Sequence, residues 1–442
     1  MPAPAFGIEA ALAQGRHLDP PDVVGDIKTR EEDFLVEEIP LYQPSGEGEH
    51  LYLFLQKEGL AHSELLRALA SHFKVKEFAI GSAGMKDRHA ITRQMVSIHL
   101  PGREPSSVQP RHPAIQVLWS ARHQNKLRRG HLRGNRFSIR IRNTDPLKAP
   151  SILSRLRVLE QAGVPNYYGM QRFGYRYNTH RLGALLLRER WDDLLGELLG
   201  ATGTRFPERQ RGGREKFDAG RYKDSLSSWS RNEQAERRAL QALIKGRSAK
   251  EAVLSISRPM LAFWMSALQS AIFNRTLDQR LDDGLLDKVE LGDVAIRHDS
   301  RRQFICHPEI LEAPGFDEEV RGFEVSATGP MWGHHMLRPF GTQMDHEVTA
   351  IRAMGCSPEE MESSRFIERG TRRPFRVAVT NIEIDSGVDG HGPYIRTAFD
   401  LPRGAYATVV LRELICGIDP VEGGPWSSDS GGDDDDDSNE DQ

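Results

Sequence analysis

The distribution of apolar positions predicts strands near both ends of the chain. Residues 50–56 form an apolar and aromatic run that is typical of a strand. In residues 137–142 apolar and polar side chains alternate, which puts Phe137 on the same face as Ile139 and Ile141. Further strands are predicted at residues 95–98, 376–384 and 395–401.

Helical spacing of apolar residues predicts helices in between. Residues 63–73 show this spacing, with Ser63 as the expected N-cap, and residues 259–281 form the clearest long amphipathic helix. Residues 203–240 are highly charged, so we expect a long surface loop or an extended helix there. Other helices are expected at residues 150–163, 345–370 and 408–414. This order favours one domain of the α/β (α+β) class that is interrupted by an insertion.

Composition agrees with a folded protein of several domains. The 442 residues correspond to about two or three domains. A hydrophobic share of 38% and a charged share of 28% exclude a wholly disordered chain. No run of 18 apolar residues and no secretory signal pattern is present, so we expect neither a membrane span nor secretion. Three widely spaced cysteines indicate no zinc site and no disulfide framework, which fits the cytoplasm.

The net charge hides two unlike parts. The formal charge is −4, but the last sixteen residues carry eight acidic side chains, and without them the chain has a charge of +4. Residues 119–142 hold eight cations and no acid, which is compatible with a surface for RNA phosphates or with an ordinary solvated strand and loop. The acidic tail is either a disordered, solubilising extension or a segment that competes with RNA for the basic surface.

The common catalytic motifs are absent, and one carboxylate stands out. There is no P-loop, no zinc-protease motif and no serine-hydrolase motif in the sequence. Asp87 lies in the polar segment Lys86-Asp87-Arg88-His89, where neighbouring cations favour the ionised carboxylate. Such a group can act as a nucleophile or general base, or it can be a turn residue in a surface salt bridge. Phe34, Phe137 and Phe399 read as ordinary core residues from periodicity alone.

Several motifs in the same order resemble the TruD family of tRNA pseudouridine synthases. Together they extend from about Ile27 to Ile415, and the resemblance is weak in residues 200–260. The motifs are Ile27-Lys28 with residues 32–38, residues 83–90 with Thr92 and Gln94, residues 134–137, residues 164–174, and residues 399–402 with 404–408 and 411–414.

The resemblance implies a fold and its boundaries. The family has a pseudouridine-synthase catalytic domain with a mainly antiparallel sheet, interrupted by an inserted α/β TRUD domain. Carried onto this chain, the boundaries give a flexible arm (1–25), the first part of the catalytic domain (26–162), the insertion (163–371), the second part of the catalytic domain (372–420) and a disordered acidic tail (421–442).

The resemblance also implies the reaction. The family converts a uridine of tRNA, usually uridine 13, to pseudouridine without a metal or an organic cofactor. Asp87 matches the catalytic aspartate, and Phe34, Asn135 and Phe399 match positions that contact the target nucleotide. Phe137 matches an aromatic residue beside the aspartate, and Lys28 is a candidate partner of its carboxylate. We expect a cytoplasmic monomer that binds tRNA and no membrane.

Two other functions are compatible with parts of the sequence. One is an RNA-binding or chaperone protein with an idle site, which the intact segment around Asp87 disfavours. The other is a metal-dependent nuclease, which needs at least two clustered acids, whereas the central motif holds one.

Overall fold

A computed structural model describes residues 11–367 and 369–418, and the chain divides into two compact units. One unit contains residues 20–164 and 377–417, and the other contains residues 165–376 together with the preceding segment that ends at residue 19. The domain boundaries expected from the resemblance, at residues 163 and 371, differ by a few residues from these limits and stay predictions. The predicted acidic tail, residues 421–442, lies outside the described residues.

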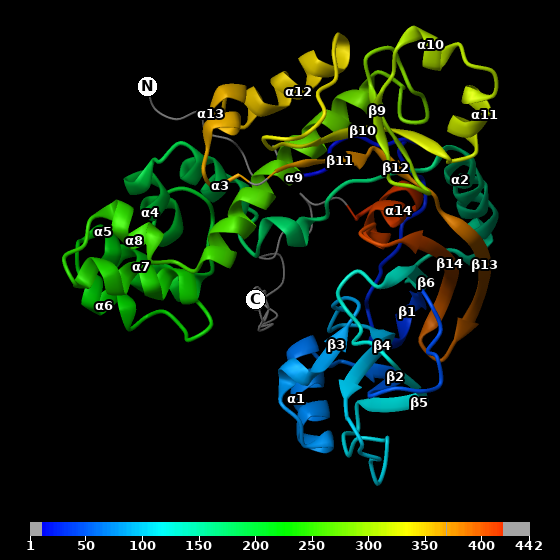
Figure 1. Ribbon diagram of the computed structural model, residues 1–442, viewed down its shortest axis with the longest axis horizontal. Helices are drawn as coiled ribbons and strands as arrows, with labels where there is room; N and C mark the ends of the chain where they lie inside the picture. The colour runs from blue at the N-terminus through cyan, green and yellow to red at the C-terminus, as the bar shows by residue number, and fades with distance from the viewer. Residues whose placement is uncertain (1–10, 368, 419–442) are drawn as a thin grey trace. The chain divides into compact units, whose positions relative to one another are not determined.

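The unit that carries Asp87 is built on an eight-stranded sheet (Figure 1). The strand order is β13-β14-β6-β1-β4-β2-β5, with β3 paired to β4. Only the β1–β4 pair is parallel among these neighbours, so the sheet is mainly antiparallel, as predicted. The strands are β1 (Phe34–Pro40), β2 (His50–Glu58), β3 (Ile80–Ser82), β4 (Ile91–His99), β5 (Ile115–His123), β6 (Leu132–Arg142), β13 (Thr380–Asp389) and β14 (Gly392–Pro402).

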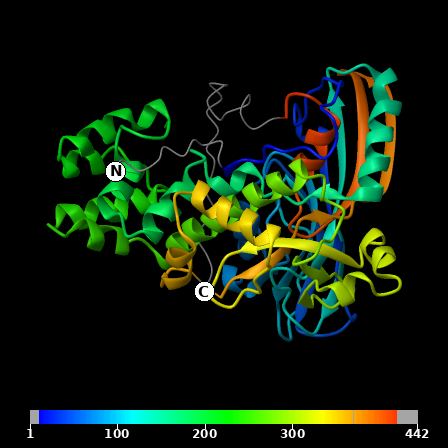
Figure 2. The same ribbon diagram turned by 90° about the horizontal axis from the view of Figure 1, so that it is seen from above.

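Helices cover parts of this sheet because their apolar faces match its buried positions. Helix α1 (His62–Phe73) packs Leu65 and Leu69 into one cluster with Leu53, Leu55 and Val96 of strands β2 and β4. Helix α2 (Ala149–Ala162) lies along β13 and β14 (Figure 2), and α14 (Ala407–Leu414) packs against α2. These helices confirm the predicted segments 63–73, 150–163 and 408–414.

The predicted N-cap of α1 is wrong. The N-cap is Ala61, which has no side-chain acceptor, while Ser63 already lies inside the helix. The carboxylate of Glu64 accepts a hydrogen bond from the Ala61 backbone N–H at 2.9 Å and ties the first turn to the cap. Sequence alone favoured Ser63 because serine is a common N-cap residue.

The second unit has a long central helix and a small sheet. Helix α9 (Arg258–Asp282) confirms the helix predicted at residues 259–281, and the sheet has the order β11-β10-β8-β9. The strands are β8 (Val294–Arg297), β9 (Gln303–Ile305), β10 (Val325–Met331) and β11 (Thr371–Pro374). The other helices are α3 (Thr179–Leu187), α4 (Trp191–Leu199), α5 (Arg211–Asp218), α6 (Tyr222–Leu226), α7 (Gln234–Ile244), α8 (Ala249–Leu254), α10 (Pro308–Leu311), α11 (Phe316–Arg321), α12 (Thr342–Ala353) and α13 (Pro358–Ser363). Short strands β7 (Val164–Pro165) and β12 (Arg376–Val377) lie where the chain passes between the units.

The segment predicted as a flexible arm is packed where the structure describes it. Ala11 and Leu12 are buried in the hydrophobic core of the helical unit. The backbone N–H groups of Gln14 and Gly15 donate to the carboxylate of Asp278 on α9, at 3.0 and 2.9 Å. The lack of regular periodicity in this segment therefore reflects irregular structure rather than a loose arm.

Residues 203–240 also differ from the prediction, because they fold into short helices with buried side chains. Arg214 is fully buried, and its guanidinium donates to the carbonyl oxygens of Leu198 and Gly200. The ring of the buried Trp229 lies 5.0 Å from this guanidinium. A charged composition suggested a surface segment, but arginine can be buried when backbone carbonyls accept its hydrogen bonds.

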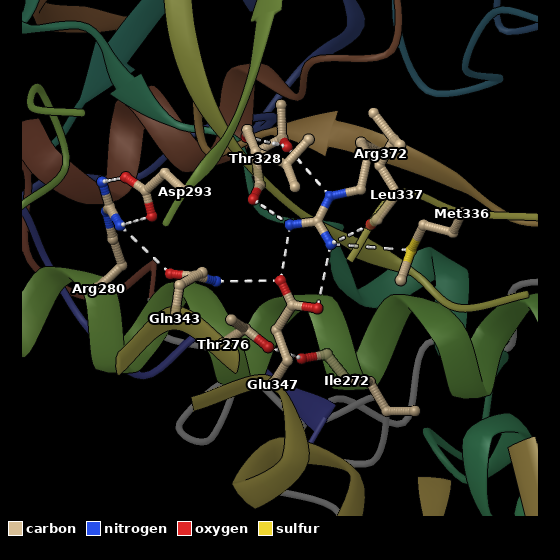
Figure 3. A network of polar contacts seen from close by, with 11 residues as sticks. Ile272, Thr276, Arg280, Asp293, Thr328, Met336, Leu337, Gln343, Glu347 and Arg372 are labelled. Carbon is tan, nitrogen blue, oxygen red and sulfur yellow. Dashed lines mark hydrogen bonds and ion pairs between the residues drawn. The ribbon is translucent and has the colours of Figure 1, made fainter. Parts of the chain in front are cut away.

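A buried network of charges holds the helical unit together (Figure 3). Arg372 and Glu347 are both fully buried and form an ion pair of 2.6 Å. Arg280 and Asp293 form a second pair at 2.6 Å, and Gln343 bridges the two pairs with contacts of 3.2 Å. Because each charge has a partner, this network is a structural element of the core.

None of the helices in residues 11–367 and 369–418 is both long and apolar enough to cross a membrane.

Candidate active site

Asp87 lies in the loop that joins β3 to β4. The carboxylate-bearing side chain is 39% exposed. The beginning of this loop is fixed by a neighbouring loop, because the Gly130 backbone N–H donates to the Ala83 carbonyl oxygen at 2.7 Å. Asp87 is therefore accessible to a ligand while its backbone is held in place.

Lys28 is the direct partner of Asp87. The Lys28 ammonium lies 2.9 Å from a carboxylate oxygen of Asp87, and the lysine side chain is 29% exposed. The same ammonium lies 4.6 Å from the centre of the Phe34 ring, a cation–π distance. Lys28 has a positive φ of 57°, a conformation that non-glycine residues adopt at some cost. The contact predicted between Lys28 and Asp87 is present, and a role in catalysis stays a prediction.

The ammonium group of Lys57 holds the backbone at Asp87 in place. The side chain is fully buried on β2, and its ammonium donates to the carbonyl oxygens of Leu60, Asp87 and Lys86 at 2.5, 2.9 and 3.3 Å. Burial lowers the pKa of Lys57 to about 8, an effect that the nearby charge of Asp87 opposes. Three carbonyl acceptors satisfy the three N–H donors of the charged form.

The three predicted phenylalanines form one aromatic cluster. The Phe137 ring lies 6.4 Å from the Phe34 ring and 5.8 Å from the Phe399 ring, measured between centroids. In the sheet, Phe137 pairs with Val36 on β1 and with Phe399 on β14. All three rings are buried, with exposures of 2% for Phe34, 7% for Phe137 and 0% for Phe399. Contact with a nucleotide stays a prediction for each of them, and it requires a ring edge to become accessible.

Asn135 lies on the same face of β6, two residues before Phe137. Gly134 precedes it because a Cβ at that position would come within 2.2 Å of the Leu401 carbonyl oxygen on β14. The Asn135 side-chain oxygen accepts a hydrogen bond from the Lys86 ammonium at 2.9 Å. The half-buried amide is therefore connected to the loop that carries Asp87.

Four of the eight cations in residues 119–142 lie next to acidic side chains. Arg142 contacts Asp33 and Asp389 at 2.6 and 2.7 Å, and Arg136 contacts Glu383 and Asp400. Arg122 and Arg140 also have acidic neighbours, Glu104 at 2.7 Å and Asp33 at 4.0 Å. The acids come from other parts of the chain, so the local charge count overstated the exposed positive charge. Arg128, Arg129 and Arg133 are exposed at the β5–β6 connection.

Within the described ranges, no group of three or more His, Cys, Asp or Glu side chains gathers as metal ligands would. The pair His334 and His335, which the sequence places next to each other, is exposed.

Sequence reasoning missed Lys57, although a signal was present. Leu51, Leu53 and Leu55 alternate along β2 and are buried, and Lys57 is the next residue on their face. A lysine that continues a buried face of a strand must find acceptors, which here are the loop carbonyls next to Asp87. Lys86 was expected only as a cation beside Asp87, whereas its ammonium contacts Asn135 and Glu38, and no role was predicted for Glu38.

Comparison with known proteins identifies the family of this chain. Residues 14–414 match the family model described as tRNA pseudouridine synthase D (TruD). A tRNA pseudouridine synthase D of Geotalea daltonii is 39% identical over 399 residues, which cover 89% of this chain and 97% of that protein. The corresponding protein of Thermus thermophilus is 32% identical over 416 residues, which cover 93% and 95%.

A solved structure supports the fold. The crystal structure of a Methanosarcina mazei protein assigned as tRNA pseudouridine synthase D matches with a TM-score of 0.78 at 24% identity, covering 96% of this chain and 100% of that chain. The family model and the curated relatives extend over nearly the whole sequence. This chain therefore belongs to the TruD family of tRNA pseudouridine synthases.

Proposed function

We propose that this protein isomerises a uridine of tRNA, uridine 13, to pseudouridine, with Asp87 as the catalytic nucleophile or general base. The observation that carries the proposal is the accessible Asp87 carboxylate, 2.9 Å from the Lys28 ammonium, on a loop whose backbone Lys57 holds. Family membership supports the reaction, and the geometry supports the choice of residue. We further propose that the protein is a cytoplasmic monomer.

The reaction conserves the atoms of the nucleotide. The N1–C1′ bond breaks, a C5–C1′ bond forms, N1 gains a proton and C5 loses one. Asp87 attacks either C1′ or the base, or it removes a proton, and its carboxylate suits each of these steps. The Lys28 ammonium orients the carboxylate, so a change at Lys28 acts on Asp87 as well.

Access to the glycosidic bond requires the uridine to leave its stack. Unstacking costs a few kcal/mol, which contacts with the flipped nucleotide must offset. Stacking on an aromatic ring contributes about 1–3 kcal/mol per base, and we propose Phe34, Phe137 and Phe399 for the aromatic wall of the site. We assign Asn135 to the edge of the base, because an amide offers both a donor and an acceptor.

The alternatives have less support. A metal-dependent nuclease requires clustered acidic ligands, and the described residues gather no such group around Asp87. An RNA-binding protein with an idle site remains a distinct outcome of the experiment below, since it predicts binding without turnover.

The test uses a tRNA transcript labelled with tritium at C5 of uridine, because pseudouridine formation releases that hydrogen. We expect the wild-type protein to release tritium and Asp87→Asn to lower the rate by at least about 1000-fold, within the range known for catalytic acid–base groups. A transcript with cytidine at position 13 should release none from that site, and mapping of the product should place pseudouridine at position 13.

The matched control is Asp22→Asn. Asp22 also forms a 2.9 Å pair with a lysine, Lys148, but that pair lies in an exposed position far along the chain from the Asp87 loop. This variant should keep wild-type activity. Full activity in Asp87→Asn would contradict the assigned role, and binding without tritium release by the wild type would support the idle-site alternative.

A further inference from the structure

The amide of Asn135 has one allowed orientation. Its contact at 2.9 Å is the ammonium of Lys86, which has three donors and no acceptor. The atom that faces Lys86 must therefore be the oxygen Oδ1. The two N–H donors of Nδ2 then point to the other side.

Glu38 fixes the position of Lys86. The Glu38 side chain is fully buried on β1, the Lys86 side chain is 5% exposed, and their charged atoms are 3.2 Å apart. Glu38 and Asn135 are also paired in register across β1 and β6. Burial raises the pKa of Glu38, and the charge of Lys86 opposes this shift. Because removal of either charge would leave the other buried without a partner, Lys86 cannot easily turn away from Asn135.

The donor side of the Asn135 amide is open to a ligand. Asn135 is half-buried, and among the described residues no side chain or backbone group accepts from its Nδ2. Lys86 and Asp87 are consecutive, with Lys86 directed to Asn135 and Asp87 paired with Lys28. The loop that carries the proposed catalytic carboxylate thus also sets the hydrogen-bonding direction of the proposed base-reading residue.

We infer that Lys86 and Glu38 are positioning residues that hold Asn135 as a donor to O4 of the target uracil and thereby select uridine over cytidine. The inference rests on the proposed function. Uracil carries the acceptor O4 where cytosine carries an amino donor, so a fixed Nδ2 group donates a hydrogen bond to uracil O4 and can make none with the cytosine amino group. A freely rotating amide would serve both bases equally.

The experiment measures binding of tRNA transcripts with uridine or cytidine at position 13, in an Asp87→Asn background that prevents turnover. The parent should prefer uridine by at least about tenfold, the discrimination that one correct hydrogen-bond pattern provides. Asn135→Asp keeps an oxygen toward Lys86 and turns an acceptor toward the base, so the preference should invert toward cytidine. The double variant Glu38→Gln/Lys86→Met frees the amide without leaving an unpaired charge, and its preference should fall to within about threefold of unity.

The matched control is Glu37→Gln/Arg93→Met. This pair joins β1 to β4 through half-exposed side chains at 2.8 Å, so it repeats the charge change without contacting Asn135, and the uridine preference should persist. Lys86→Arg keeps a donor-only partner and should retain the preference. If the double variant does not fold, Asn135→Asp alone decides, since it keeps both buried charges.

An unchanged preference in Asn135→Asp, or equal weakening for both transcripts, would overturn the inference. Failure of the proposed function would give a different result, namely a wild-type protein that forms no pseudouridine. If the wild type forms pseudouridine and a folded double variant Glu38→Gln/Lys86→Met keeps the full uridine preference, the role of Lys86 and Glu38 is refuted while the proposed function stands.

Discussion

A single buried lysine controls the backbone around the proposed catalytic residue. Lys57 donates to three carbonyl oxygens, two of them at Lys86 and Asp87. The neutral amine has two N–H groups and a lone pair, so it cannot satisfy all three acceptors. Protonation of Lys57 and the geometry of the loop are therefore coupled.

The pKa of Lys57 predicts an alkaline limit of activity. Because burial lowers this pKa to about 8, we expect kcat to fall as the pH rises through about 8. Lys57→Met should lower kcat by about 100-fold, the size of effect that a misplacement of about 1 Å produces. The pH profile of this variant should lack the fall in kcat near pH 8. The measurement is tritium release against pH, with the exposed Lys76→Met as the control that keeps the wild-type profile.

Stability should change in the opposite direction, which separates the two effects. Between about pH 8 and the unfolded value of 10.5, the unfolded chain binds a proton at this lysine and the folded chain does not. The contribution of Lys57 to the free energy of unfolding therefore rises with pH in this window. Parallel losses of activity and of Lys57-dependent stability would contradict the explanation by loop geometry.

At the scale of elements, one arginine joins three parts of the sheet. Arg142 at the end of β6 contacts Asp33, directly before β1, and Asp389 at the tip of the β13–β14 hairpin. Arg142 and Asp33 are buried, and the Arg142 guanidinium holds the pKa of Asp389 well below its usual range. Asp33 directly precedes Phe34 in the sequence, so this pair anchors the start of β1, the strand that carries Phe34.

Arg142→Met should destabilise the protein by about 3–5 kcal/mol, because it leaves the buried Asp33 carboxylate without its main partner. The comparison variant is Arg396→Met, which breaks an exposed pair with Asp385 on the same hairpin and should cost less than about 1 kcal/mol. Urea unfolding of both variants measures the difference. Equal losses of unfolding free energy in the two variants would mean that burial does not determine how much the Arg142–Asp33 pair contributes to stability.

Periodicity predicted most strands and helices, although residues 345–370 divide into α12 and α13 and residues 203–240 into several short helices, and it predicted their partners poorly. The alternation in residues 137–142 correctly placed Phe137, Ile139 and Ile141 on a buried face. It could not reveal that Arg136 and Arg142 face acids from β13 and β14, since those residues lie more than two hundred positions away. The buried Arg214 shows the same limit, because its acceptors are backbone carbonyls that no residue pattern marks.

The site could be predicted only in part for a similar reason. Asp87 stood out by its charged neighbours, but its contact with Lys28 connects positions 59 residues apart and came from the family resemblance. Periodicity assigned Phe34, Phe137 and Phe399 to the core, and all three are buried. The orientation of the Asn135 amide depends on Lys86 and could not be derived without coordinates.

At the scale of the whole molecule, the positive charge left for RNA is smaller than the sequence suggests and more localised. Arg128 and Arg129 lie in the β5–β6 connection, residues 124–131, and Arg133 follows at the start of β6. This connection is held to the Asp87 loop by the hydrogen bond from the Gly130 N–H to the Ala83 carbonyl oxygen. Cations at this position can contact phosphates of an RNA whose target nucleotide lies at Asp87.

Removal of two of these cations should weaken tRNA binding in a salt-dependent manner. Each phosphate contact contributes about 0.9 to the slope of log affinity against log salt, so Arg128→Gln/Arg133→Gln should lower the slope by up to about 2. The exposed pair of changes Lys74→Gln/Arg111→Gln alters the net charge equally without touching the β5–β6 connection. An equal loss of slope in both variants would show that net charge, rather than the cations next to the Asp87 loop, determines RNA binding.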